Sequence, residues 1–155
     1  MMMISRKTLI WFSGLVFLMN WSALSMAEER AMKISITLGN KVIQATLLDN
    51  PTAREFISQL PLTLTLTDYN STEKISDLPK KLTKKDAPAA IDPSIGDITY
   101  YAPWGNLAIF YRDFGHSPGL IKLGTINSGI EALSVPGPIK ATISLVNPES
   151  TNQER

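Results

Sequence analysis

The sequence predicts a mainly β protein, a closed barrel of about eight strands with one main helix and a short second helix. Most of the chain after residue 31 consists of short runs in which apolar and polar residues alternate, the period of a strand with one buried face. One segment alone, 51–60, shows helical spacing over more than one turn. The pattern fits a barrel or a sandwich, and a closed barrel is favoured because it leaves no exposed sheet edge.

The first two strands are predicted from the segment KISITLGNKVIQATLL. Ile34, Ile36 and Leu38 alternate with polar residues, and a second alternating run covers 42–47. Gly39-Asn40 separates the two runs, and both residue types tolerate a positive φ angle. This pattern predicts a β-hairpin.

A helix follows, because the period changes in DNPTAREFISQLP. Asn50 is suited to cap the helix, and Pro51 is suited to its first position. Pro61 is expected to end it. The apolar residues of this segment share one helical face: Ala53, Phe56, Ile57 and Leu60.

The remaining elements complete the barrel. LTLTLT (62–67) alternates strictly and predicts a strand with leucines inside and threonines outside. Further strands are expected at 97–102, 106–111, 120–126 and 139–146, and a short helical turn at 128–133. We expect one domain over residues 32–146 and a disordered polar tail over 147–155.

Residues 1–27 show the three-part pattern of a secretory signal peptide. Arg6 and Lys7 precede an apolar run that begins at Leu9, and small residues in Ser-Met-Ala end the segment. The uninterrupted apolar run is about 11 residues, shorter than the roughly 20 that cross a bilayer. We expect cleavage after Ala27 and a periplasmic or secreted protein free of the membrane. An uncleaved N-terminal anchor is the alternative.

Charge and composition narrow the choice of partners. Without residues 1–27, the chain has 13 basic and 14 acidic residues, a net charge of −1, which does not favour nucleic acid or an anionic membrane. The basic cluster lies in a proline-rich segment and is interpreted as a solvated face: Lys80, Lys81, Lys84 and Lys85. The chain has no cysteine, which excludes disulfides and thiolate metal sites. No metal-ligand cluster or cofactor motif is recognised, so we expect neither a metal nor a cofactor.

The stretch YYAPWGNLAIFYRDFGHSP (100–118) holds six aromatic residues and the single histidine of the chain. Adjacent strand residues point to opposite faces, so Tyr101 cannot share the core with Tyr100, nor Tyr111 with Phe110. One member of each pair is expected in the barrel and the other outside it or in a groove. Trp104, in a Pro-Trp-Gly turn, is the strongest candidate for an exposed role. For the other rings, core packing and ligand contact both remain open.

His116 lies in a Gly-His-Ser-Pro-Gly segment. A lone histidine without cysteine cannot form a usual zinc site. Asp113 and Ser117 are close in sequence, but sequence neighbours rarely have triad geometry, and the chain has no nucleophile elbow. We interpret His116 as a surface loop residue, with contact to a bound ligand as the functional alternative.

The segment from Ile95 to Leu133 resembles the second half of a cyclophilin. Gly96 begins the first shared motif, Phe110-Tyr111 lies near the paired phenylalanines, and GTINSGI (124–130) reproduces the Phe-Gly-x-Val-x-x-Gly-Met spacing. Together with DNPTAREFISQLPLTLTLTDYN, it is more similar to the small bacterial cyclophilin-like family, over residues 32–146. The resemblance implies a cyclophilin-like barrel with a binding groove whose rim is the 113–119 loop.

The sequence departs from cyclophilins where they carry their catalytic groups. No arginine lies between Leu62 and Asp77, and Ala108-Ile109 stands where the glutamine is expected. Arg112 follows Tyr111 on a different strand, so no catalytic residue is assigned. Without a donor aimed at the prolyl nitrogen, the barrier of about 18–20 kcal/mol to amide rotation is not lowered.

We therefore interpret the protein as a non-catalytic module that binds a peptide or small molecule. The candidate groove residues are Tyr101, Trp104, Phe110, Tyr111 and His116. A divergent peptidyl-prolyl cis-trans isomerase acting on exported proteins is the alternative, and a domain that only contacts a partner protein is a third reading.

Overall fold

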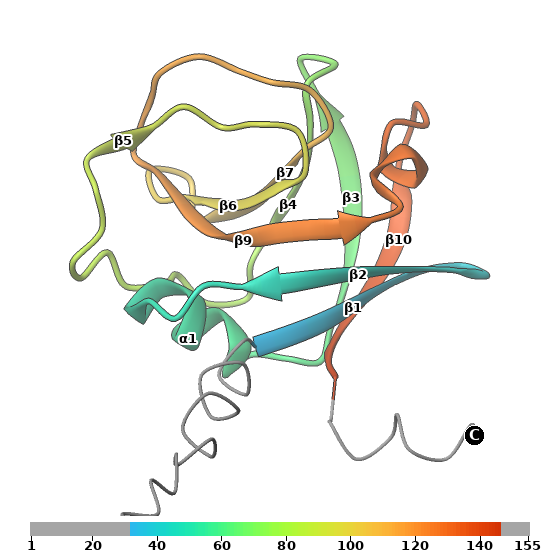
Figure 1. The fold of residues 1–155 in the computed structure, drawn as a ribbon, viewed down its shortest axis with the longest axis horizontal. Coiled ribbons are helices and arrows are strands. Elements are labelled where there is room, and N and C mark those ends of the chain that lie inside the picture. Colours follow the sequence, from blue (N-terminus) through green and yellow to red (C-terminus); the bar gives the residue numbers. More distant parts are fainter. Residues whose placement is uncertain (1–31, 147–155) are drawn as a thin grey trace, which may run out of the picture.

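The fold is a closed barrel of eight antiparallel strands (Figure 1). It is known from a computed structural model that describes residues 32–146, so the predicted signal peptide (1–27) and tail (147–155) lie outside the described residues. The strand order is β1-β10-β3-β4-β7-β6-β9-β2. The strands are β1 (Met32–Leu38), β2 (Lys41–Leu47), β3 (Leu62–Tyr69), β4 (Glu73–Asp77), β6 (Asp97–Tyr101), β7 (Asn106–Phe110), β9 (Leu120–Ser128) and β10 (Ile139–Leu145). The predicted mainly β barrel is confirmed.

The alternation of the sequence sets the barrel interior. In β3, Leu64 and Leu66 are buried and Leu62 is half-buried, while the three threonines between and after them are exposed, as predicted. Ile34, Ile36 and Leu38 of β1 are buried in the same way. Gly39 has a φ angle of 61° in the turn that joins β1 to β2, which is the predicted hairpin.

The main helix, α1 (Pro51–Ile57), packs its buried Ala53 and Phe56 against the barrel. The Asn50 side chain caps it by accepting a 2.8 Å hydrogen bond from the Ala53 amide. The helix ends at Ile57 rather than at Leu60, because residues 58–60 form a turn before Pro61, which disfavours helical geometry in the preceding residue. The short second helix is a 3₁₀ turn, η3 (Ile130–Leu133).

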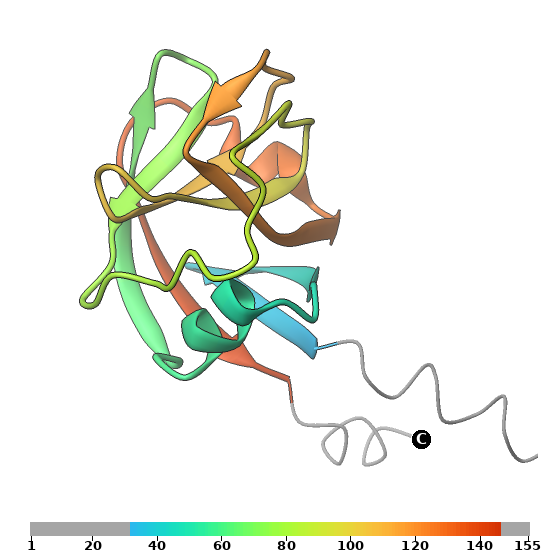
Figure 2. The ribbon, with the colours of Figure 1, turned by 90° about the vertical axis from the view of Figure 1, so that its left-hand side faces the viewer.

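A small two-stranded sheet covers part of the outer barrel wall. It pairs β5 (Ala90–Ile91) with β8 (Ser117–Pro118), and Figure 2 shows the chain between β4 and β6 running along the outside of the barrel. The sequence did not predict this sheet. Its consequence is that both faces of β7 are buried, one by the barrel core and one by the cover.

Strand β4 was also missed. Its sequence, EKISD, carries a lysine at an inward position, which conceals the apolar alternation of a strand. Lys74 is nevertheless fully buried, because its ammonium group donates to the carbonyls of Val135 (2.8 Å) and Gly137 (2.7 Å) and pairs with Asp68 (2.8 Å). A buried charge is tolerated when its hydrogen bonds are satisfied in this way.

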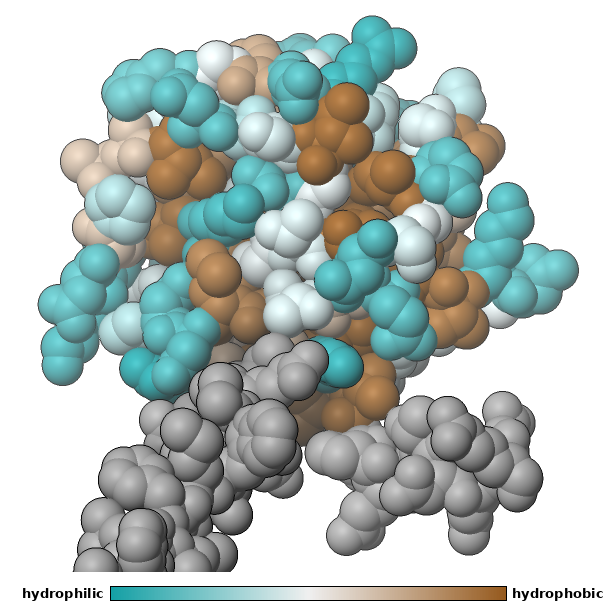
Figure 3. Space-filling view, viewed as in Figure 1, coloured by the Kyte–Doolittle hydropathy of each residue, from teal (hydrophilic) through white to brown (hydrophobic). Residues whose placement is uncertain are grey.

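The surface of residues 32–146 is mixed in character. On the face drawn in Figure 3, polar and apolar side chains are interspersed. The four lysines of the basic cluster are all exposed, in agreement with a solvated face. Among these residues, no helix has the length and apolar character needed to span a bilayer.

Candidate ligand-binding groove

The candidate site lies on the outer wall of the barrel, where strand register aligns side chains in rows. Tyr69 of β3 is opposite Glu73 of β4, which is opposite Phe110 of β7. Directly opposed residues of antiparallel strands project to the same face, so these three side chains form one row. A parallel row, four residues along β7 from Phe110, runs through Asn106 and Tyr101.

A groove of about 310 Å³ lies over these rows. Ile75 and Leu120 contribute to its apolar lining, and Ser117 and Pro118 of β8 border it. Beneath it, Ala108, Phe110 and Leu120 form a buried cluster that is separate from the barrel core. The groove is therefore built on a small second core outside the barrel.

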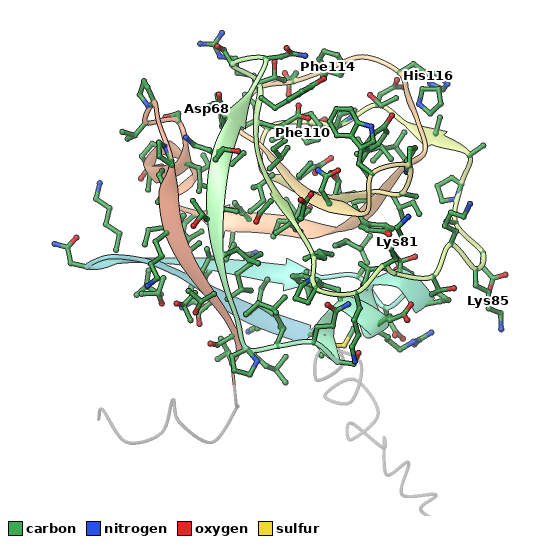
Figure 4. All side chains as sticks on the ribbon, turned by 180° about the vertical axis from the view of Figure 1, so that it is seen from behind. Asp68, Lys81, Lys85, Phe110, Phe114 and His116 are labelled. Atoms are coloured by element: carbon green, nitrogen blue, oxygen red, sulfur yellow. The ribbon has the colours of Figure 1, made fainter. Side chains whose placement is uncertain are left out.

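Aromatic rings make up much of the groove. Trp104 meets Tyr69 edge-to-face at a centroid distance of 5.5 Å and Tyr101 at 5.3 Å. Phe110 and Phe114 stack at 6.5 Å, and Figure 4 labels both residues and His116 in the upper part of the molecule. Trp104 and Phe114 are 55% and 51% exposed, which leaves ring surface available to a ligand.

Glu73 is the carboxylate of this lining. Its side chain is half-buried, and no hydrogen bond or ion pair to it is found among residues 32–146. Desolvation by burial raises the pKa of Glu73 to about 7. The groove therefore holds a carboxyl group that changes charge near neutral pH.

Two further polar side chains line the groove. Asn106 is buried; its Nδ2 donates to the Leu107 carbonyl (3.1 Å), and its Oδ1 has no partner within the described part of the chain. His116 is exposed at the rim, with Nδ1 3.4 Å from a carboxylate oxygen of Asp92. No cluster of three or more histidine, aspartate or glutamate residues that could hold a metal ion occurs between residues 32 and 146.

The structure brings together four of the five candidate residues, Tyr101, Trp104, Phe110 and His116. The alternation predicted for β6 and β7 places Tyr100 in the barrel core and Phe110 in the outer cluster. The 113–119 loop borders the groove, as the resemblance implied.

Tyr111 does not line the groove. Parity places it on the same side as Ile109, which belongs to the barrel core. Its hydroxyl donates to Asp68 (3.0 Å), which also accepts from Lys74 and from the Gly137 amide. These contacts, led by the hydrogen bond from Lys74, hold the pKa of Asp68 below its usual range. Tyr111 thus contributes to a polar network that also anchors the loop before β10.

Sequence reasoning missed Glu73, Asn106 and Phe114. Glu73 was hidden because β4 was not recognised, and strand pairing alone brings it beside Phe110. The signal available was the Asp-Tyr-Asn-Ser-Thr turn after the Leu/Thr strand, where Asn70 and Ser71 take φ angles of 50° and 52°. A hairpin at that turn would have predicted a partner strand containing Glu73.

An eight-stranded closed barrel with an aromatic groove on its outer wall defines the class of fold, and comparison with known proteins identifies the family. The profile of the Cyclophilin-like family matches residues 36–144, so the chain belongs to the cyclophilin-like family. No curated protein matches the chain significantly.

The fold is also similar to a solved structure. The solution structure of the hypothetical protein AF2241 from Archaeoglobus fulgidus superimposes with a TM-score of 0.59 and 18% sequence identity. The match covers 75% of this chain and 95% of that chain. At this identity the likeness concerns the fold alone.

Proposed function

We propose that the protein is an exported binding module that holds a peptide or small molecule in the outer-wall groove without catalysing a reaction on it. The observation that carries this proposal is the groove itself, about 310 Å³ with clustered and partly exposed rings. Small-molecule sites are typically concave, mostly apolar and about 300–1,000 Å³, with a few polar groups that orient the ligand. The N-terminal signal-peptide pattern supports export.

The lining of the groove argues against prolyl isomerisation. That reaction needs a donor aimed at the prolyl nitrogen, and the groove lining contains no arginine or lysine among the described residues. Arg112 is exposed beyond β7 and does not line the groove. The amide of Asn106 already donates to a backbone carbonyl.

A binding screen by NMR tests the proposal. The ¹⁵N-labelled protein, purified from cells that express the full chain, is titrated with small aromatic, aliphatic and prolyl-peptide compounds. We expect at least one compound to shift the amide signals of groove residues. Trp104→Ala should weaken that binding about 2–10-fold, because a packed ring contributes about 0.5–1.5 kcal/mol. Val42→Ala is the control, because Val42 is exposed and lies outside the groove.

Two results would contradict the proposal. The first is a screen in which no compound shifts the groove signals. The second is acceleration of proline isomerisation that disappears in Arg112→Ala, which would establish the isomerase alternative.

Mass spectrometry of the exported protein should also give a chain that begins at Glu28, and an intact N-terminus would contradict the predicted cleavage.

A further inference from the structure

The groove lining is acidic rather than basic. Within residues 32–146, it holds one carboxylate, that of Glu73, and neither lysine nor arginine. The register places this carboxylate between two aromatic residues, Tyr69 on β3 and Phe110 on β7. Cross-strand partners of this kind have Cβ atoms about 4.5–5.5 Å apart, so Tyr69 and Phe110 are the nearest cross-strand neighbours of Glu73.

Three aromatic rings of the groove lining form adjoining walls. Trp104 is nearly perpendicular to both tyrosines, with interplanar angles of 87° to Tyr69 and 82° to Tyr101. Aromatic faces attract organic cations, and sites for alkylammonium groups combine several rings in this way. Among the side chains of residues 32–146, the buried oxygen Asn106 Oδ1 has no hydrogen-bond partner and is also an acceptor, so the groove is complementary to a positively charged ligand.

We propose that the groove selects a small organic cation, an alkylammonium compound whose charged head lies among the rings beside Glu73. This inference rests on the proposed function, because the site is the same. The volume of about 310 Å³ is at the lower end of the range for small-molecule sites, which favours a compact compound over a peptide segment.

Charge complementarity makes binding dependent on pH. Glu73 has a pKa of about 7, so its carboxylate is fully charged only above neutral pH. The other titratable side chains of the lining are Tyr69, Tyr101 and His116.

Three other titratable side chains near Glu73 lie outside the groove lining. Lys74 projects to the opposite face of β4 and is paired with Asp68, Tyr111 bonds the same aspartate, and Arg112 is exposed. A bound cation stabilises the ionised form of Glu73, so affinity should rise with pH through the neutral range.

Calorimetry with two matched probes tests the inference. Choline carries a trimethylammonium head, and 3,3-dimethylbutan-1-ol is its neutral isostere with carbon in place of nitrogen. At pH 8, we expect the protein purified from cells that express the full chain to bind choline at least tenfold more tightly than it binds the alcohol. Between pH 5.5 and pH 8, its affinity should rise about tenfold as Glu73 ionises.

The variants separate the roles of the charge and the rings. Glu73→Gln should remove most of the preference for choline, leaving the part that the rings supply, and all of its dependence on pH. Trp104→Ala should weaken choline binding severalfold, because a ring wall is lost. Glu131→Gln removes the same charge from an exposed position outside the groove and should change nothing. His116→Gln should keep the dependence on pH, which assigns it to Glu73.

The possible failures are distinguishable. Equal binding of choline and the alcohol at pH 8, or a preference that is undiminished in Glu73→Gln, overturns the inference and leaves the proposed function standing. The capped peptide acetyl-Gly-Lys-Gly-amide carries its ammonium group on a lysine side chain. If it binds more tightly than choline, the inference is also overturned, because the preferred ligand would then be a peptide. If neither these probes nor the screened compounds shift the groove signals by NMR, the proposed function fails as well.

Discussion

The two faces of β7 are both buried, but they belong to two different hydrophobic clusters. Its inward residues, Leu107 and Ile109, belong to the large core that closes the barrel. Its outward residues, Ala108 and Phe110, belong to a small cluster covered by the β5–β8 sheet, with a groove above it. The difference indicates that inward substitutions act mainly on stability, whereas outward substitutions act on stability and on ligand binding together.

The largest expected effect comes from neighbouring substitutions on β7. Ile109→Ala should lower the free energy of unfolding by about 3–4 kcal/mol, because it leaves a cavity in the enclosed barrel core. Phe110→Ala should cost slightly less, about 3 kcal/mol, the low end of the range for a buried phenylalanine, because the small outer cluster can collapse beside an open groove. Denaturant unfolding measures both values.

Ligand binding provides the second half of this test. The folded fraction of Ile109→Ala should bind groove ligands normally, while Phe110→Ala should bind them weakly. If both variants lose binding equally, or if Phe110→Ala is the less stable, the two faces are not separable.

A second substitution sharpens the comparison at the seam between β2 and β9. Gly124 lies so close to β2 that an added Cβ atom would overlap the Thr46 carbonyl oxygen and approach Leu47 Cα to 2.8 Å. Gly124→Ala should therefore destabilise the barrel by about 2–3 kcal/mol, because backbone atoms must move apart.

Gly115→Ala is the matched control for this glycine. Gly115 has nothing within 4 Å of its Cβ position and lies in the 113–119 loop at the groove, so the substitution should leave stability within about 0.5 kcal/mol. Thermal unfolding of the two variants measures the difference. Equal melting temperatures would show that the close approach of β2 and β9 does not constrain the barrel.

The sequence predicted the elements whose pattern is local. The Gly39-Asn40 hairpin, the Asn50 cap and the Leu/Thr strand each follow from a few adjacent residues, and each is confirmed. The strict alternation of β3 also predicted which side chains face inward. Such features need no knowledge of distant contacts.

The elements that were missed depend on contacts far apart in the sequence. Lys74 occupies an inward position of β4 because carbonyls about sixty residues away accept its hydrogen bonds, at separations of 61 and 63 residues. The β5–β8 sheet joins two-residue strands that carry no pattern of their own. Glu73 meets Phe110 through the pairing of β4 with β7, which joins residues far apart in the sequence, so its carboxylate was harder to predict than most of the rings.

The smallest expected effect concerns Glu73, and it is the one that depends on pH. Because its pKa is raised from 4.5 to about 7 in the folded state, the folded protein binds the proton more tightly than the unfolded chain does. The resulting stabilisation is complete below about pH 4.5 and is lost as pH rises through about 7. The wild-type protein should therefore be less stable at pH 8 than the Glu73→Gln variant, whose side chain is never charged.

The two proteins should have similar stability at pH 5, where Glu73 is mostly protonated. At pH 8 the variant should be more stable by about 1 kcal/mol, a value kept small because the half-exposed carboxylate is screened by solvent. Denaturant unfolding at both pH values measures the difference, and Glu131→Gln, which alters an exposed carboxylate, should show none. A constant difference between Glu73→Gln and wild type at the two pH values would mean that packing, and not desolvation of the charge, distinguishes this position. Glu73 would then be ionised throughout the neutral range, and cation binding would lose its predicted dependence on pH.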